Sequence, residues 1–573
     1  MIQKAFRPFP CAFYPTLIYC IVLFLLLFLL FCRRALATLL FPTMNPEALP
    51  PLTGRCFRKV TLKGSRWRVC LLVFSAIITI IKKNHLCIRI FRSIFRICIF
   101  AFGKEYHMYQ IDFNHPISVY FCGIGGISMS GLAEILASRG FRVSGSDRAS
   151  SAITKELVSH GIQVLIGQKA ENITPDLDLI VFTAAIHPDN PEFQKARELN
   201  IPHLTRAELL GEIMRNYGCP VAIAGTHGKT TTTSMISEIL LGAEDDPTIS
   251  VGGILKSIHG NVRVGHSDYF VAEACEYTNS FLSLYPKIGV ILDIDADHLD
   301  FFKDLDDIRS SFRRFAELIP EDGTLIINSD IENYKELTDG LKCHVITYGS
   351  DRTKSEYYPV NIRYDEAAHP TYTCCHRTAT GGHTQLIRLQ VPGLHNIYNS
   401  IAAVAVADLL GVERELTGKA LLSFEGTDRR FEYKGEMNGV TIIDDYAHHP
   451  TEIHATLEAA EKLPHNRIFC IFQPHTYTRT KALMDEFAEA LSQSDVVVLA
   501  DIYAARETDT LGISSATLAD RIRALGHNEV YYFPSFEEIE NFIRKNCQKG
   551  DLVITMGAGN VTDIGPSLLL QNK

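Results

Sequence analysis

The feature that most constrains this chain is a glycine-rich loop between an apolar strand and a helix. Strand Val221–Ala224 leads into GTHGKT at residues 225–230, and helical spacing continues through Thr231–Leu241. In such a loop backbone N–H groups cradle anionic oxygens, Lys229 reaches the β/γ-phosphates, and the Thr230 hydroxyl can ligate Mg²⁺. The loop is shorter than the usual G-x-x-x-x-G-K-T. Its strand–loop–helix context nevertheless predicts a nucleoside triphosphate site in a parallel α/β domain.

A second glycine loop lies upstream and has the pattern of a nucleotide-binding unit. The expected order is strand Ile117–Cys122, glycines Gly123, Gly125 and Gly126, helix Ser128–Arg139, strand Arg142–Ser144 and Asp147. A glycine turn that opens a helix can hold a phosphate, and an acid about 20 residues further on suits a ribose hydroxyl. NAD and a UDP pyrophosphate would use the same contacts, and glycines that serve only close packing are a third interpretation. The triphosphate loop favours an ATP-coupled reaction on a nucleotide-carried substrate over an NAD-dependent oxidoreductase.

Length and charge divide the chain into a body and an extension. At 573 residues it has room for three or four domains. Residues 1–107 hold 16 Lys/Arg against 2 Asp/Glu, whereas the remainder holds 40 against 63. The acidic body has no basic face with interleaved aromatics, which argues against nucleic acid as a partner. The 15 cysteines include no C-x-x-C pair, which fits a reducing cytosol.

The extension contains an apolar run, Leu17–Cys32, that approaches the length of a membrane span and is followed by Arg33 and Arg34. One interpretation is therefore a membrane anchor or signal segment. The other is a start codon assigned too far upstream, since Met108 opens a segment where an α/β protein would naturally begin. On the second interpretation, we expect a chain that begins at Met108 to be soluble and active.

Five ordered motifs of the body resemble the Mur ligase family of cell-wall synthesis. They are AGTHGKTTTT, VAEACEYTNSFL, DIDADHLDFF, LHNIYNSIAAVAVA and DDYAHHPTEI, and the resemblance covers about residues 111–570. Within the family, GIGGISMSG, GTDRRFE and QPHTYTR are similar to the member that joins L-alanine to UDP-N-acetylmuramate. The resemblance implies a cytoplasmic ligase with ATP and Mg²⁺, in which the muramoyl carboxylate becomes an acyl phosphate before the alanine amine attacks it.

The resemblance also implies where each substrate binds. ATP is assigned to Gly225, Thr226, His227, Gly228, Lys229, Thr230, Thr231, Asn396 and Asn399. Mg²⁺ is assigned to Thr230, Glu273 and His298, and Glu276 is either a supporting group or a solvated acid. Asn396 and Asn399 share one helical face and suit the adenine edge, although they could instead cap the helix.

Residues of the last third are expected to complete the reaction site. Arg429 and Arg430 resemble the family's clamp on phosphate and substrate, since a guanidinium fork suits phosphate. His448, His449, His475 and Arg479 follow consecutive strands, where ligands of open α/β sheets bind. The resemblance implies that Tyr446, His448, Arg479 and their neighbours, including His475, meet the substrate carboxylate and the incoming alanine, with Arg506 part of the same rim. It places His187 at the muramoyl end of the UDP-sugar, which Gly123, Gly125, Gly126 and Asp147 also bind.

We therefore predict an α/β fold of three domains behind the extension. Residues 108–218 form a Rossmann-like UDP-sugar domain, 219–427 the P-loop ATP domain, and 428–573 a Rossmann-like domain for the amino acid. Residues 350–390 are expected to form alternating strands without assignable chemistry. The alternatives are a peptide ligase of cell-wall recycling, a folylpolyglutamate synthase, an NAD-dependent oxidoreductase and a membrane-anchored scaffold. Lys229→Ala is expected to abolish ligation with little loss of stability, on the view that Lys229 is a surface cation.

Overall fold

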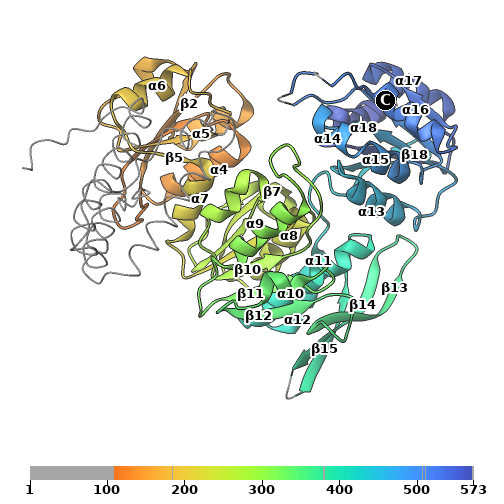
Figure 1. Ribbon diagram of the computed structural model, residues 1–573, viewed down its shortest axis with the longest axis horizontal. Helices are drawn as coiled ribbons and strands as arrows, with labels where there is room; N and C mark the ends of the chain where they lie inside the picture. Colours follow the sequence, from red (N-terminus) through yellow and green to blue (C-terminus); the bar gives the residue numbers. More distant parts are fainter. Residues whose placement is uncertain (1–108, 184, 379–380, 506, 510, 571–573) are drawn as a thin grey trace, which may run out of the picture. The chain divides into compact units, whose positions relative to one another are not determined.

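The computed structural model describes residues 109–570 except 184, 379–380, 506 and 510 (Figure 1). The extension 1–107, with its predicted apolar run, and Arg506 therefore lie outside the described residues. Among the described helices, none has both the length and the apolarity to span a bilayer. Three separate sheets follow one another along the chain, coloured from orange through green to blue in Figure 1. This is the three-domain α/β architecture that the sequence predicts.

The first sheet is wholly parallel, with strand order β3-β2-β1-β4-β5. Its elements are β1 (Ser118–Cys122), α4 (Ile127–Ser138), β2 (Arg142–Asp147), α5 (Ala152–Ser159), β3 (Gln163–Ile166), the 3₁₀ turn η3 (Ala170–Asn172), β4 (Leu179–Phe182), α6 (Pro191–Glu198), β5 (His203–Thr205) and α7 (Arg206–Met214). Strand order turns back between β1 and β4, so the glycine loop after β1 opens at the point where α/β sheets bind ligands.

The second sheet has ten strands in the order β15-β14-β13-β12-β11-β10-β6-β9-β7-β8. Its elements are β6 (Cys219–Ala224), α8 (Lys229–Gly242), β7 (Thr248–Leu255), η4 (Lys256–Ile258), β8 (Gly260–Arg263), β9 (Tyr269–Glu273), η5 (Tyr277–Ser283), β10 (Ile288–Ile291), α9 (Leu305–Ala316), β11 (Thr324–Asn328), α10 (Tyr334–Thr338), β12 (His344–Tyr348), β13 (Tyr357–Tyr364), β14 (Pro370–Thr378), β15 (Gly381–Arg388), α11 (Leu394–Leu410) and α12 (Arg414–Ser423). Strands β13 to β15 form an antiparallel extension, which confirms the strands predicted for 350–390.

The third sheet has the order β16-β17-β21-β18-β19-β20 and is parallel except for the hairpin β16–β17. Its elements are β16 (Glu432–Met437), β17 (Val440–Asp445), α13 (Pro450–Ala460), β18 (Ile468–Phe472), α14 (Tyr477–Ala482), α15 (Met484–Leu491), β19 (Val496–Leu499), α16 (Ser515–Ala524), β20 (Val530–Tyr532), α17 (Phe536–Asn546), β21 (Leu552–Met556), η6 (Asn560–Asp563) and α18 (Ile564–Leu570). Apolar side chains on both faces of this sheet enter separate buried clusters, as expected for a parallel sheet covered on both sides.

Helix α11 is buried through most of its length and anchors the middle domain. Its run Ile401–Ala407 consists of alanine, valine and isoleucine, and the helix packs against α8 and strands β11 to β14. Small side chains let two helices approach closely, so α11 lies directly beside the helix that follows the phosphate loop. The first turn of α11 and the phosphate loop are thereby held in a fixed relation.

The segment just after β10 matters for the site. Strand β10 ends at Ile291. The Leu292 carbonyl accepts hydrogen bonds from Asn328 Nδ2 at 3.0 Å and from the Tyr348 hydroxyl at 3.4 Å, so side chains replace the sheet partner there. The chain then turns, and the Asp293 carboxylate accepts a hydrogen bond from the His227 N–H at 2.8 Å.

Candidate active site

The phosphate loop connects β6 to α8 and requires glycine at two positions. Gly225 and Gly228 have φ of +151° and +79°. A Cβ on Gly225 would lie 2.9 Å from Asp293 Oδ1, and one on Gly228 would lie 2.5 Å from Asn399 Oδ1. Any side chain would therefore be strained by the backbone and would collide with its neighbours. The loop is fitted between the end of β10 and the first turn of α11.

Lys229 lies folded against the loop rather than in solvent. Its Nζ donates hydrogen bonds to the Gly225 carbonyl at 2.5 Å, the Thr226 carbonyl at 3.0 Å and the Glu276 carboxylate at 2.9 Å. Burial lowers the pKa of Lys229, but the Glu276 charge outweighs it, so the net shift is upward and the amine stays charged. The description of Lys229 as a surface cation is wrong, because its side chain is 16% exposed. Glu276 is not a solvated acid either, because its side chain is 3% exposed and pairs with this lysine.

Thr230 and Glu273 lie against two glycines of strand β7, Gly253 and Gly252 respectively. The Gly252 N–H donates to Glu273 Oε1 at 2.6 Å, and a Cβ on Gly252 would lie 2.7 Å from Glu273 Oε2. A Cβ on Gly253 would lie 3.1 Å from the Thr230 methyl group. The two glycines thus leave room around a hydroxyl and a carboxylate, which are hard oxygen donors of the kind Mg²⁺ prefers.

His298 is the third predicted metal ligand and lies beside the Lys229–Glu276 pair. Its Nε2 is 3.7 Å from Glu276 Oε1 and 3.8 Å from Asp297 Oδ2, and its ring centre is 4.6 Å from that of Tyr277. Burial lowers the pKa of His298 although Asp297 opposes the shift, so the imidazole is neutral at physiological pH. A neutral imidazole has a free lone pair, and the residue therefore fits a ligand role.

The predicted adenine residues line a cavity of about 230 Å³ together with the phosphate loop. Asn399 Nδ2 donates to Asn396 Oδ1 at 3.1 Å, and Asn396 Nδ2 donates to the Pro392 carbonyl at 2.6 Å. The capping alternative is wrong, because α11 begins after Gly393 and neither asparagine is its N-cap. Other lining residues come from the last third of the chain and include Arg430, Phe431, Asp445, Thr451 and Glu452.

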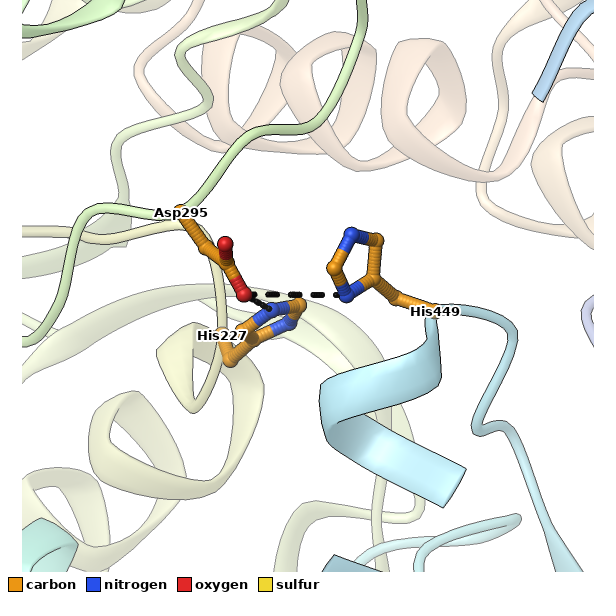
Figure 2. Close-up of side chains that lie close together, drawn as sticks. All are labelled: His227, Asp295 and His449. Atoms are coloured by element: carbon orange, nitrogen blue, oxygen red, sulfur yellow. Dashed lines mark ion pairs between the residues drawn. The ribbon is translucent and has the colours of Figure 1, made fainter. Parts of the chain in front are cut away.

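Titratable side chains join the phosphate loop to the C-terminal domain. In Figure 2 one oxygen of Asp295 faces two neighbouring imidazoles, 3.5 Å from His227 Nε2 and 3.8 Å from His449 Nδ1. The other nitrogen of His227 lies 3.1 Å from Glu452 Oε1. Burial lowers the pKa of His227, but the charges of Asp293, Asp295 and Glu452 raise it well above the ordinary value. This histidine is therefore an imidazolium held among carboxylates.

Glu452 is the centre of this junction and was not singled out from the sequence. Its Oε2 accepts hydrogen bonds from the His448 N–H at 3.0 Å and faces His448 Nδ1 at 3.2 Å, whereas Oε1 faces His227. Burial raises its pKa, but His448 and His227 hold it well below the ordinary value. The available signal was the spacing of His448 and Glu452, four residues apart at the start of α13, which places both at the helix N-terminus.

A second cavity, of about 540 Å³, lies at the loops after β10 and β18. Arg479 donates to Asp297 from Nε at 3.0 Å and from Nη2 at 3.3 Å, and Asp297 is adjacent to His298. His475 Nδ1 lies 3.3 Å from Arg479 Nη1, and burial lowers the pKa of His475 to about 4. The cavity thus has a neutral imidazole and a fixed guanidinium next to the candidate metal ligands.

Arg429 and Arg430 do not act as one clamp in this structure. Arg429 donates to the carbonyls of Gly557 at 2.5 Å and Gly559 at 3.0 Å, so it fastens a loop of the C-terminal domain. Arg430 lines the cavity that also includes Asn396 and Asn399. Both guanidiniums lie over the Tyr446 ring, at 4.8 and 5.0 Å from its centre. Tyr446 is therefore engaged with the arginines.

The first glycine loop lies at the edge of the N-terminal domain. The Gly125 N–H donates to Asp147 Oδ2 at 2.9 Å, and Gly123 has φ of +86°. His187 lies exposed in the loop after β4. Arg206 was not predicted as a site residue, yet its Nη1 donates to Ser128 Oγ at 3.1 Å. It lines a cavity of about 210 Å³ that also includes Ser128, Glu273 and Cys275.

Three α/β sheets, a glycine loop of the phosphate-binding type, a cavity lined by Asn396 and Asn399 and a cluster of charged side chains are typical of a multidomain nucleotide-binding protein. Family models match three successive segments: "Mur ligase family, catalytic domain" at 118–218, "Mur ligase middle domain" at 223–407 and "Mur ligase, glutamate ligase domain" at 429–559. These segments cover more than half of the chain. The chain belongs to the Mur ligase family.

Individual relatives agree with this assignment. UDP-N-acetylmuramate–L-alanine ligase from Lachnospira eligens is 61% identical over 462 residues, which are 81% of this chain and 100% of that protein. The ligase of the same name from Agathobacter rectalis is 59% identical with the same coverage. Among solved structures, UDP-N-acetylmuramate–alanine ligase from Thermotoga maritima is 29% identical with a TM-score of 0.66, covering 80% of this chain and 99% of that one.

Proposed function

We propose that this protein is an ATP-dependent ligase that joins L-alanine to the carboxylate of UDP-N-acetylmuramate in peptidoglycan precursor synthesis. The observation that carries the proposal is the 61% identity to the Lachnospira eligens ligase over that protein's whole length. The ATP loop, the adenine cavity and the charged cluster beside them support it. Membership of the family implies the use of ATP, and the neighbouring carboxylate and hydroxyl of Glu273 and Thr230 support Mg²⁺.

The proposed reaction has two steps, formation of an acyl phosphate and formation of the amide. An oxygen of the muramoyl carboxylate attacks the γ-phosphorus, the bond to the bridging oxygen breaks, and ADP leaves behind an acyl phosphate. The amine of L-alanine then attacks the acyl carbon, gives up a proton and expels inorganic phosphate, which leaves the amide. Two anions approach one another in the first step, so the site has to supply positive charge.

The phosphate loop supplies most of that charge in our proposal. Lys229 is charged and is held by Glu276 and two carbonyls, so a triphosphate has to draw the amine away from this buried carboxylate. Thr230, Glu273 and His298 would hold Mg²⁺, which when bound offsets the repulsion between the two anions. Asn396, Asn399 and Arg430 are assigned to the nucleotide because they line the same cavity as the loop.

The second cavity is our candidate site for the second step. Arg479, fixed by Asp297, presents a guanidinium that suits the alanine carboxylate. His475 is neutral because burial lowers its pKa to about 4, so its lone pair can accept a hydrogen bond from the amine. The ring centre of His448 lies 6.0 Å from that of His475 and 5.2 Å from that of Tyr446. Water has to be kept from the acyl phosphate, which favours a reaction enclosed between domains.

We assign the UDP-sugar to residues 108–218, ATP to 219–427 and the amino acid to 428–573. Arg206, Ser128 and Glu273 line one cavity, which supports a path from the first domain to the metal ligands. Gly123, Gly125, Gly126 and Asp147 then face the nucleotide of the UDP-sugar and His187 its muramoyl end.

The test is phosphate release by the full chain with ATP, Mg²⁺ and UDP-N-acetylmuramate, supplied in turn with single amino acids and with a peptide. We expect release that requires both the UDP-sugar and L-alanine. Release only with the peptide would instead assign the protein to peptide recycling. No release with any acceptor would overturn the proposed reaction.

A further inference from the structure

Two histidines and an aspartate gather in the middle domain outside the proposed reaction site. His376 on β14 and His383 on β15 are direct partners in the antiparallel register, and Asp408 lies in the last turn of α11. Opposite residues of antiparallel strands project from the same face of the sheet. One nitrogen of each histidine and one oxygen of Asp408 lie within 4.8 Å of one another.

The separations suit a single ion between the three groups. His383 Nε2 is 3.0 Å from Asp408 Oδ2, and His376 Nδ1 is 3.8 Å from the same oxygen. Ligand atoms about 2.0–2.2 Å from a tetrahedral zinc ion lie roughly 3.4 Å apart. The two observed distances fall on either side of that value, so small side-chain rotations would complete the geometry.

One of the three groups has no hydrogen-bond partner in the described part of the chain. His376 Nδ1 is buried and unpaired. A buried polar atom without a partner costs free energy, and such atoms are rare in native proteins. At 3.8 Å, Asp408 is too far away to satisfy it by a hydrogen bond. A metal ion between the two would satisfy it.

The surrounding side chains hold the three groups in place. The Tyr357 hydroxyl donates to Asp408 Oδ2 at 3.1 Å, and the Tyr357 ring stacks on His376 with centres 4.0 Å apart. Arg414 Nε lies 3.9 Å from Asp408 Oδ1, the oxygen that faces away from the histidines in this arrangement. Partners of this kind orient metal ligands and are important for affinity.

We propose that His376, His383 and Asp408 bind a divalent transition-metal ion of the zinc class. Two imidazoles with one carboxylate favour Zn²⁺ and similar ions over Mg²⁺ and Ca²⁺, which take oxygen ligands. A set of three leaves a fourth position for water. The ion would fasten the β14–β15 hairpin to the end of α11, about 18 Å along the helix from Asn396.

The test measures zinc bound by metal-stripped full chain after equilibrium dialysis against Zn²⁺ with excess Mg²⁺. We compare wild type with His383→Gln, and with His369→Gln as the matched control. His369 belongs to the same domain and also pairs with an aspartate, Asp365, at 3.3 Å, but lacks a second imidazole. Wild type and the control are expected to bind about one more zinc per chain than His383→Gln.

A second variant tests the geometry without removing a ligand. Tyr357→Phe removes the hydrogen bond to Asp408 and is expected to weaken zinc binding about 10- to 100-fold. Equal zinc binding by wild type, His383→Gln and Tyr357→Phe would overturn the proposal, because the zinc would then lie elsewhere, such as at the cysteines or at His227, Asp295 and His449. Displacement of the zinc by equimolar Mg²⁺ would overturn the assigned class of ion.

Discussion

Two clusters, one at the phosphate loop and one on the β14–β15 hairpin, contain the same side chains, two histidines and an aspartate, yet they differ in what surrounds them. At the phosphate loop, the imidazoles of His227 and His449 share Asp295, and Asp293 and Glu452 add two more carboxylates around His227. In the hairpin cluster of His376, His383 and Asp408, one carboxylate faces two imidazoles and Arg414 adds positive charge.

The difference teaches that charge balance and connectivity, rather than residue type, decide what such a cluster does. The first cluster holds a protonated His227, which has no lone pair for a metal, and it joins segments 222 residues apart, from His227 to His449. It therefore acts as a junction between domains. The second lies within one hairpin and the helix packed on it. Each cluster has a buried imidazole nitrogen without a hydrogen-bond partner, His227 Nε2 in the first and His376 Nδ1 in the second, but the His227 ring is protonated and His376 has only one carboxylate nearby. The second cluster has the properties of an ion site.

At the phosphate loop, the largest effect on the reaction is expected for Lys229→Ala. Phosphate release should fall by roughly 10²–10³-fold or more, because a fixed charge at the transferred phosphoryl group is lost. Stability should also fall, by about 3–5 kcal/mol, because Glu276 is left buried without its partner. Steady-state kinetics and urea unfolding measure the two effects. Adding Glu276→Gln should restore stability but not turnover, and full turnover in the single variant would contradict the assignment of the loop.

Glu452→Gln tests the junction directly. Loss of the charge between His227 and His448 should lower kcat/KM for ATP roughly tenfold to 100-fold, or about 1.4–2.8 kcal/mol, because the C-terminal domain is then held less firmly against the loop. Glu461→Gln is the matched control, since Glu461 ends the same helix and faces His465 at 4.0 Å, but with its side chain 55% exposed. If both variants retain wild-type kinetics, the junction has no part in the reaction.

The raised pKa of His227 predicts how stability depends on pH. A raised pKa in the folded state gives stability that is fully present below the unfolded value of 6.5 and is lost as pH rises through the folded value. Above pH 6.5 the free energy of unfolding of the wild type should therefore fall more steeply than that of His227→Asn, by at most about 1.4 kcal/mol per pH unit. The pKa values of Asp295 and Glu452 are lowered, so the stability that these two carboxylates contribute is lost only in acid, as pH falls through their folded-state pKa values. Parallel unfolding curves above pH 6.5 would mean that His227 is neutral.

The smallest effect is expected for His383→Gln without added metal. Phosphate release should stay within about twofold of wild type, since no residue of β13, β14 or β15 lines the three described cavities. Stability should fall by about 0.5–1.5 kcal/mol, because one hydrogen bond to Asp408 is lost. Kinetics and urea unfolding with a chelator present measure both. A loss of activity as large as that of Glu452→Gln would remove the contrast between the two clusters.

Local motifs were enough to predict the phosphate loop, because a strand, a glycine turn and a helix are adjacent in sequence and their roles follow from backbone geometry. Thr230, Lys229 and the face shared by Asn396 and Asn399 belong to this class. Contacts between residues far apart in the sequence could not be predicted in this way. Arg479 and Asp297 are 182 residues apart, and Arg429 fastens a loop 128 residues away. Neither contact can be predicted from residue spacing or composition.

The amino-acid sequence by itself determined the α/β class, the phosphate loop and the order of the domains, since each follows from apolar periodicity and glycine positions within short segments. Only the tertiary structure decided which charges are buried together. It paired Lys229 with Glu276, made Glu452 the link between His227 and His448, and brought His376 and His383 to Asp408. The physical reason is that burial and Coulomb energy depend on distances in space, and those distances are fixed by packing between segments far apart in the chain.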